Sequence, residues 1–389
     1  MKIKYCLILF LLITTVSYGK SSDYFSIDYN SARSKFRSSV ASFKDVNTKA
    51  FPIENEKQDL TVDAAFFPAL KKTKSLLILL SGVHGVEAYA GSAIQLQFLD
   101  KTLPELSREN LGVLLVHSLN PYGFMHNRRV DQNNIDLNRN FAINDSHFKQ
   151  KNQDYLKLKS FLNPEFKAST SIKNKIAFYA NAIFKIIQSS IKSLRAATLK
   201  GQFEVLKGIF FGGKKPQTQT AILKDIVSSF ELTDYENVLT VDLHTGYGER
   251  GKLHYFSFLS KNSQNQKFLN DLFKDYSVDL GSDEDFYKVT GDSTVFMESL
   301  FSDVENHAGM TFEFGTLDSQ TSMGAIESLR RIILENQGHH YGYQDKKSEK
   351  NVKSLFLEMF NPSDLVWREA VLNQANNSLN VLIPRLEQY

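Results

Sequence analysis

Two residues in one short segment could hold a metal ion. His84 and Glu87 lie three positions apart in the stretch 81–92, which reads SGVHGVEAYAGS. An imidazole and a carboxylate at this spacing converge on one side of a helical turn, where both can bind the same cation. The apolar run at 76–80 that precedes them is typical of a buried strand, and ligands bind at the carboxyl ends of such strands. Because His-x-x-Glu is also common by chance, its meaning depends on the rest of the chain.

A second histidine follows another apolar run. His244, in the stretch 241–248 (VDLHTGYG), lies just past its run, as His84 does. Two histidines and a carboxylate would leave an open position on a zinc ion, as a catalytic zinc site requires, although His244 alone is equally compatible with a core histidine. Glu313 is a carboxylate within an apolar run, where burial is costly unless the group is paired or functional. Beside zinc, such a carboxylate can act as the general base.

The segment 120–141, NPYGFMHNRRVDQNNIDLNRNF, is the most distinctive part of the sequence. Its opening Asn-Pro-x-Gly is typical of a turn. Arg128, Arg129 and Arg139, together with Asn138, supply rigid cationic and polar groups that suit carboxylates and oxyanions. The segment therefore favours a substrate that carries, or develops, negative charge.

Taken in order, these segments resemble the zinc carboxypeptidase superfamily, which includes the metallocarboxypeptidases and the aspartoacylase and succinylglutamate desuccinylase group. The motifs that carry the resemblance are His84-x-x-Glu87, Asp136-Leu-Asn-Arg139, Asp242-Leu-His244 and Thr311-Phe-Glu313. The stretches SGVHGVE, NPYGF and GIFFGG (208–213) are similar to a bacterial branch of that superfamily known as DUF2817. The resemblance covers about residues 50–340.

The resemblance implies a metal centre with one general base. His84, Glu87 and His244 correspond to the ligands of Zn²⁺. Asp136 corresponds to the carboxylate that orients the ring of His84. Glu313 corresponds to the general base.

It also implies how the substrate is bound. Asn138 and Arg139 correspond to the pair that binds the terminal carboxylate of the substrate. Arg129 is assigned to the scissile carbonyl and its oxyanion, and its neighbour Arg128 stays open as the alternative for this role. The expected partner is thus a peptide or an N-acyl amino acid with a free carboxylate.

Apolar runs that alternate with helical patterns predict an α/β domain. With the resemblance, we expect the three-layer zinc carboxypeptidase-like fold, in which helices flank a mixed central sheet. The lysine-rich stretch at about 144–206 is expected to be a helical insertion, because isoleucines recur in it at three- and four-residue spacing. It is either a helix with a solvated basic face, a lid over the site or a surface for anionic envelope material. Core strands are expected at 61–67, 76–80, 112–118, 238–243 and 310–314.

The first residues have the order of a secretory signal peptide. Two lysines precede an apolar run at 5–13, and small residues follow, so we expect a signal peptide at 1–19, a catalytic domain at 20–389 and a periplasmic or secreted protein. An N-terminal anchor is the alternative. Cleavage would remove the one cysteine, which leaves histidine and carboxylates as metal ligands, and would lower the net charge from +3 to +1. Such a near-neutral mature chain gives no general reason to expect nucleic acid or an anionic membrane as partner. The apolar run is too short to span a bilayer comfortably, so we expect no stable membrane span after cleavage.

We therefore expect a zinc-dependent hydrolase of amide bonds. A carboxypeptidase that acts on exported or cell-wall peptides is the leading hypothesis, and an N-acyl amino acid deacylase of the aspartoacylase type is its close competitor. A catalytically silent carboxylate-binding protein is the alternative from another class, but it would have no need of Glu313. A serine hydrolase is disfavoured because no Gly-x-Ser-x-Gly motif precedes the histidines.

Overall fold

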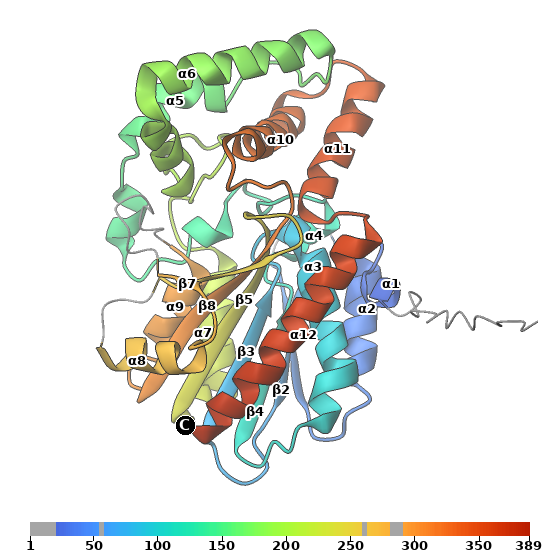
Figure 1. The fold of residues 1–389 in the computed structure, drawn as a ribbon, viewed down its shortest axis with the longest axis vertical. Helices are drawn as coiled ribbons and strands as arrows, with labels where there is room; N and C mark the ends of the chain where they lie inside the picture. Colours follow the sequence, from blue (N-terminus) through green and yellow to red (C-terminus); the bar gives the residue numbers. More distant parts are fainter. Residues whose placement is uncertain (1–20, 54–57, 259–262, 281–290) are drawn as a thin grey trace, which may run out of the picture.

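A mixed sheet forms the centre of the molecule. The structure is a computed structural model that describes residues 21–53, 58–258, 263–280 and 291–389 (Figure 1). Within these residues, eight strands pair in the order β1-β2-β4-β3-β5-β8-β6-β7. The central pairs β4·β3, β3·β5 and β5·β8 are parallel, whereas β1·β2, β2·β4 and β6·β8 are antiparallel. The strands are β1 Asn47–Pro52, β2 Thr61–Phe67, β3 Ser75–Ser81, β4 Leu111–His117, β5 Asn237–Gly246, β6 Leu253–Phe256, β7 Val278–Asp279 and β8 Asn306–Gly315.

Helices cover both faces of this sheet and form a separate cluster at one end. The α-helices are α1 Ser21–Tyr24, α2 Tyr29–Val40, α3 Ala88–Gln97, α4 Pro121–Met125, α5 Gln153–Leu162, α6 Ile172–Leu199, α7 Thr218–Ser229, α8 Ser263–Leu272, α9 Ser293–Leu300, α10 Ser322–Tyr341, α11 Lys346–Phe360 and α12 Leu365–Gln388. Short 3₁₀ turns are η1 Gly85–Glu87, η3 Leu103–Glu105, η4 Leu137–Arg139, η5 Asp145–Lys149 and η6 Leu232–Asp234, and Phe98–Thr102 is a π turn.

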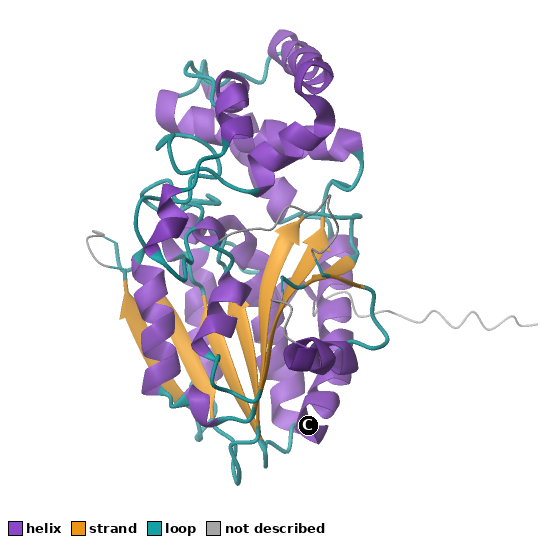
Figure 2. Cartoon of the chain, turned by 90° about the vertical axis from the view of Figure 1, so that its left-hand side faces the viewer, coloured by secondary structure: helices purple, strands orange, loops and turns teal. Residues whose placement is uncertain are grey.

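Two apolar cores lie on opposite faces of the sheet. Alternate residues of β3 point to opposite sides, so Leu77 and Leu79 pack with α3, α8 and α12, whereas Ile78 and Leu80 pack with α7 and α9. Because both faces are covered, every residue of β3 is buried and the strand is a continuous apolar run. Figure 2 shows the resulting layers of helix, sheet and helix. The α/β fold with a mixed, helix-flanked sheet that the sequence predicted is therefore confirmed.

The predicted helical insertion is also present. It comprises η5, α5 and α6, and it lies above the carboxyl ends of the central strands together with α10 and α11 (Figures 1 and 2). Tyr155 and Leu158 of α5 pack in one core with Ala182 of α6 and Ile326 and Leu329 of α10. The helix α6 is kinked at residue 190, where the backbone has φ 72° and ψ 155°.

The predicted signal peptide at 1–19 lies outside the described residues. In the part of the chain that is described, no helix is both long and apolar enough to cross a bilayer.

Candidate metal centre and active site

The carboxyl ends of β3 and β5 bring two histidines and a glutamate together. His84 follows β3 in an extended conformation, and the single 3₁₀ turn η1 then carries Glu87 back towards it. Glycine is required at 85, because a side chain there would collide with the backbone of Gly123 in α4. His244 lies within β5, the parallel neighbour of β3. Glu87 and His244, which are 157 positions apart in the sequence, thus meet at the carboxyl ends of neighbouring strands.

The three side chains form a compact, buried set of donors. One ligand atom from each of His84, Glu87 and His244 lies within 4.8 Å of the others. Nδ1 of His84 is 2.8 Å from Oε1 of Glu87, and Nδ1 of His244 is 2.9 Å from Oε2 of Glu87. Nδ1 of His84 is buried and has no hydrogen-bond partner among the described residues. A buried ring nitrogen without a hydrogen bond, close to a carboxylate oxygen and to a second ring nitrogen, can share one cation with them, so these residues fit a zinc ion.

A carboxylate holds the second nitrogen of each ring. Nε2 of His84 lies 3.0 Å from Oδ1 of Asp136, and Nε2 of His244 lies 2.8 Å from Oδ2 of Asp242. Both carboxylates are buried. Such contacts fix the orientation of a ligand ring and direct its Nδ1 towards the metal.

The charges around this set keep its carboxylates ionised. Burial alone would raise the pKa of Glu87, but the charge of His84 and the hydrogen bond from His244 outweigh burial and hold this pKa well below its usual range. The pKa of Asp136 is likewise lowered, because Arg129 and His84 more than offset the effect of burial. The site therefore has the ionised carboxylates that a cation needs.

Glu313 reaches the same place from β8. In the parallel pairing of β5 with β8, Glu313 is the register partner of His244. Its Oε1 accepts a hydrogen bond of 2.8 Å from the backbone N–H of Tyr247. Gly246, with φ 137°, turns the chain so that this N–H faces the carboxylate. Burial raises the pKa of Glu313 to about 8, and the negative charge of Glu87 adds to the rise. A carboxyl group with such a pKa can gain and lose a proton near neutral pH.

The arginines of the distinctive segment have different environments. Arg129 lies beside the donors, where its Nε donates to Oδ2 of Asp136 at 3.0 Å and its Nη1 to Oε1 of Glu87 at 3.1 Å. Arg128, in contrast, points to Glu335 of α10, with Nε 2.8 Å from Oε1. The structure therefore brings Arg129 to the site and places Arg128 outside the cavity that contains it.

Asn138 and Arg139 also lie at the site, in η4. Oδ1 of Asn138 accepts a hydrogen bond of 2.9 Å from the N–H of Ser293, at the start of α9. Nη1 of Arg139 donates to the carbonyl of Asn138 at 2.8 Å, while its buried Nε has no partner among the described residues. An unpaired guanidinium N–H in a buried position is available to an anionic ligand.

The glycine-rich stretch 208–213 supports the loop that carries these residues. The N–H of Asp136 donates to the carbonyl of Phe211 at 2.8 Å, and Nδ2 of Asn140 donates to the carbonyl of Gly212 at 2.8 Å. At position 212 a side chain would collide with Phe203 and with the carbonyl of Arg139. This motif thus has a structural task, because it fixes the position of the loop relative to the ligands.

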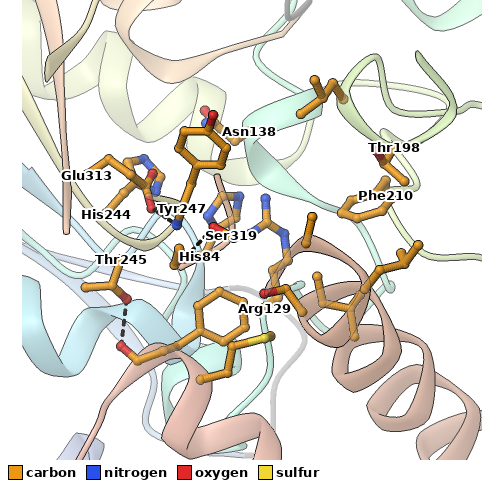
Figure 3. A pocket seen from close by; sticks show the side chains of 18 of the residues that line it. His84, Arg129, Asn138, Thr198, Phe210, His244, Thr245, Tyr247, Glu313 and Ser319 are labelled. Atoms are coloured by element: carbon orange, nitrogen blue, oxygen red, sulfur yellow. Dashed lines mark hydrogen bonds between the residues drawn. The ribbon is translucent and has the colours of Figure 1, made fainter. Parts of the chain in front are cut away.

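A cavity of about 390 Å³ is lined by the three donors, by Glu313 and by Arg129, Asn138 and Arg139 (Figure 3). In Figure 3 the side chains of His84, His244 and Glu313 lie on one side of the cavity and Thr198 and Phe210 on the other. Arg129 lies between them, with its guanidinium 5.8 Å from the centre of the Phe210 ring. The helices above the sheet form the remaining wall, which is largely apolar. That wall is built by Ile186, Leu194 and Leu199 of α6, Ala325, Ile326, Leu329 and Ile332 of α10, and Met359 and Phe360 of α11.

Three residues at the site carried too weak a signal to be assigned roles from the sequence. Asp242 was noted as part of a motif but was given no role. It lies two residues before His244 in a strand, so both side chains are on one face, and this spacing could have identified Asp242 as the partner of the His244 ring. The hydroxyl of Ser293 donates to Asp242. Tyr247 lines the cavity and holds Glu313 through its backbone. Neither Ser293 nor Tyr247 belongs to a pattern of residue types that could be recognised by spacing.

The comparison with protein families matches almost the entire described domain. The family described as "Protein of unknown function (DUF2817)" matches residues 25–374. This chain belongs to the DUF2817 family. No curated protein sequence matches this DUF2817 chain.

Several solved structures are similar to the DUF2817 chain. Bovine thrombin-activatable fibrinolysis inhibitor, solved in complex with tick carboxypeptidase inhibitor, has 12% identity and a TM-score of 0.46, with 85% of this chain and 99% of that chain covered. Carboxypeptidase A from Helicoverpa armigera has 12% identity and a TM-score of 0.44, with 80% and 74% covered. A metallo-carboxypeptidase from Burkholderia cenocepacia has 9% identity and a TM-score of 0.41, with 78% and 66% covered.

Proposed function

We propose that this DUF2817 protein is a zinc-dependent hydrolase of amide bonds, and that it acts as a carboxypeptidase on peptides. The observation that carries the proposal is the convergence of His84, Glu87 and His244, whose two rings are each oriented by a buried carboxylate. Glu313, in register with His244 on the next strand, adds a carboxylate that the three donors themselves do not require. This combination of an open set of ligands and an adjacent base is what hydrolysis of an amide bond needs.

Four charged side chains at the site have tasks in the proposed reaction. A bound zinc ion would supply a Lewis acid that polarises the scissile carbonyl and makes a water molecule more acidic. Glu313 takes the proton of the attacking water and passes it to the nitrogen of the leaving amine. Arg129 stabilises the negative charge that develops on the carbonyl oxygen. Asp136 and Asp242 hold the ligand rings in place throughout.

The free carboxylate of the substrate is assigned to Arg139 and Asn138. This assignment is supported by the buried, unpaired Nε of Arg139 and by the position of both residues on the cavity wall. A guanidinium offers parallel donors that match the two oxygens of a carboxylate. A substrate held in this way would present its last amide bond to the metal.

The apolar wall of the cavity also suits one competing function. An N-acyl amino acid deacylase needs room for the acyl group of its substrate, and the side chains of α6, α10 and α11 provide apolar surface for such a group. Apolar side chains of a peptide would fit the same wall. The two functions share the carboxylate and the chemistry, and they differ in what lies on the acyl side of the scissile bond.

The site of action is proposed to be outside the cytoplasm. The support comes from the basic start, apolar run and small residues of the first 19 positions. Exported and cell-wall peptides would then be available as substrates.

A substrate panel tests the proposed function. The purified, zinc-loaded protein is incubated with N-blocked dipeptides and with N-acyl amino acids, each as the free acid and as the C-terminal amide, and the released amines are quantified. We expect hydrolysis of the free acids and little or none of the amides, because the amides lack the charge that Arg139 would bind. Preferential cleavage of dipeptides supports the carboxypeptidase, and preferential cleavage of N-acyl amino acids supports the deacylase. Equal cleavage of acids and amides would overturn both.

A further inference from the structure

The helix α6 presents an apolar face to solvent. Ile172, Ile176, Ile183 and Ile187 are 78%, 64%, 55% and 79% exposed. Their spacing of four, seven and four residues puts them on one side of the helix. Six of the fifteen large apolar side chains that are exposed among the described residues lie within 166–187, so these isoleucines are part of a concentrated patch. A patch of this kind marks an interaction site.

The charge of this region has one sign. Residues 166–203 contain no aspartate or glutamate but seven basic residues, whereas the whole chain carries only +3. These basic residues are Lys167, Lys173, Lys175, Lys185, Lys192, Arg195 and Lys200. Lys173 and Lys175 are exposed beside the isoleucines.

Two acidic side chains from neighbouring helices contact α6 at its hydroxyl groups. Glu327 of α10 accepts a hydrogen bond of 2.6 Å from Tyr179 and forms ion pairs with Arg330 and Arg331. Asp154 of α5 accepts a hydrogen bond of 2.7 Å from Ser193. Because these two acids bind hydroxyl groups, and α6 has no acid of its own, the exposed Lys173 and Lys175 leave the outer side of α6 with an excess of positive charge.

The position of α6 leaves its outer side open to a large partner. Ala182 is buried against α5 and α10, and Phe178, Tyr179 and Ile186 pack into the same core. The isoleucines lie away from this core. Figures 1 and 2 show α6 at the far end of the molecule, above α5 and α10 and remote from the sheet.

We propose that α6 docks on the surface of an anionic lipid bilayer through a docking face made of Ile172, Ile176, Ile183 and Ile187. A helix with an apolar side, lysines beside it and no acidic residue is the type that lies in the bilayer interface. Lysines near an anionic surface add attraction, which a zwitterionic surface does not provide. A second copy of this chain fits the face less well, because its own α6 would bring lysines against lysines.

The docking face and the cavity share this helix. Ile186, Leu194 and Leu199 of α6 line the cavity that contains the donors. A bilayer on the outer side of α6 would therefore lie close to the apolar wall of the candidate active site. The inference itself does not depend on the proposed function, because bilayer binding is measured without any substrate.

Co-sedimentation with vesicles tests the proposal. The full chain and the variant I172Q/I176Q/I183Q/I187Q are mixed with vesicles of phosphatidylcholine alone, or with 30 mol% phosphatidylglycerol. Glutamine keeps a high helix propensity, so the variant removes the apolar surface and retains the helix, which circular dichroism checks. We expect the unchanged chain to bind the anionic vesicles, to bind them less at high salt, and to bind phosphatidylcholine weakly. The variant should lose at least about tenfold in affinity for the anionic vesicles.

Two further variants separate the causes of binding. I27Q/L70Q/V366Q replaces equally exposed apolar residues far from α6 and should bind like the unchanged chain. K173Q/K175Q/K185Q should lose most of the preference for anionic vesicles. Because all variants keep residues 1–20, binding caused by the N-terminal segment would survive in every one of them.

Two results would overturn the proposal. One is equal vesicle binding by the isoleucine variant and the unchanged chain. The other is sedimentation velocity that shows a dimer of the unchanged chain, lost in the isoleucine variant, without any binding to vesicles. In that case a second copy covers the docking face.

Discussion

At the level of single residues, Glu313 is the group whose task can be separated from metal binding. His84, Glu87 and His244 form the set of donors, and Glu313 stands beside it on the next strand. Its carboxylate is held by the N–H of Tyr247, and burial together with the charge of Glu87 raises its pKa to about 8. A group placed in this way is expected to move protons and not to serve as a ligand.

Replacement of Glu313 by glutamine should therefore abolish turnover and retain the metal. Gln has nearly the same shape and cannot accept the proton of the water, so we expect kcat to fall by about 10³-fold or more, while the zinc content stays unchanged. Steady-state kinetics and metal analysis of the same preparation measure both. A variant that turns over as fast as the unchanged protein would exclude Glu313 as the base.

Replacement of Arg139 by alanine should act mainly on substrate binding. Loss of a charged hydrogen-bonding partner should raise KM for free-acid substrates by about 10- to 100-fold and change kcat much less. The zinc content and the circular dichroism spectrum of the variant are the controls, because they report any general damage to the site. If KM for free acids stays the same, the carboxylate is bound elsewhere.

At the level of elements, the sequence predicted the strands whose ends carry the chemistry. The runs at 76–80 and 310–314 were recognisable because β3 and much of β8 are buried, and burial requires a continuous apolar sequence. The outer strands β1, β6 and β7 were not predicted. Only one residue of β1 is buried, and β7 has two residues, so neither has a pattern to recognise.

The candidate site was also predictable only in part. Residues within motifs, such as His84 and Asp136, could be selected by type and spacing. The choice between Arg128 and Arg129 could not, because only the tertiary structure shows that Glu335 of α10 holds Arg128. Likewise, the contribution of α6 to the cavity wall depends on how the insertion packs on α10.

The contact between α9 and β8 predicts a dependence of stability on pH. Glu298 of α9 is buried, and its Oε1 accepts a hydrogen bond of 2.9 Å from the N–H of Gly309 in β8. Burial, with a contribution from Asp292, raises the pKa of Glu298 to about 8 although the N–H of Gly309 opposes the rise. The folded state therefore holds this proton more tightly than the unfolded state, whose pKa is about 4.5.

The contribution of Glu298 to the free energy of unfolding should consequently be greatest below about pH 4.5, and it should fall as the pH rises to about 8. Glu298→Gln removes this loss, so the free energy of unfolding of the variant relative to the unchanged protein should increase from pH 5 to pH 9 by roughly 2–4 kcal/mol. Urea denaturation at both values measures the difference. Glu105→Gln, at an exposed position, is the control and should show no such increase. A difference for Glu298→Gln that does not change with pH would contradict the assignment.

At the level of the whole molecule, the sheet and the helices above it have separate tasks. The carboxyl ends of β3, β5 and β8 position the donors and Glu313. The insertion and α10 enclose them, so the cavity has a polar end at the sheet and an apolar wall at the helices. We therefore expect changes in the insertion to alter which substrates fit without any change at the donors.

The central claim is that His84, Glu87 and His244 hold one zinc ion, and the zinc content of the purified protein tests it most directly. After dialysis against metal-free buffer, mass spectrometry of the metals should find about one zinc per chain in the unchanged protein and in a His126→Ala control, and less than about 0.1 in H84A/H244A. Two results would contradict the account. One is that the unchanged protein contains no zinc even after incubation with excess metal, and the other is that H84A/H244A retains as much zinc as the unchanged protein.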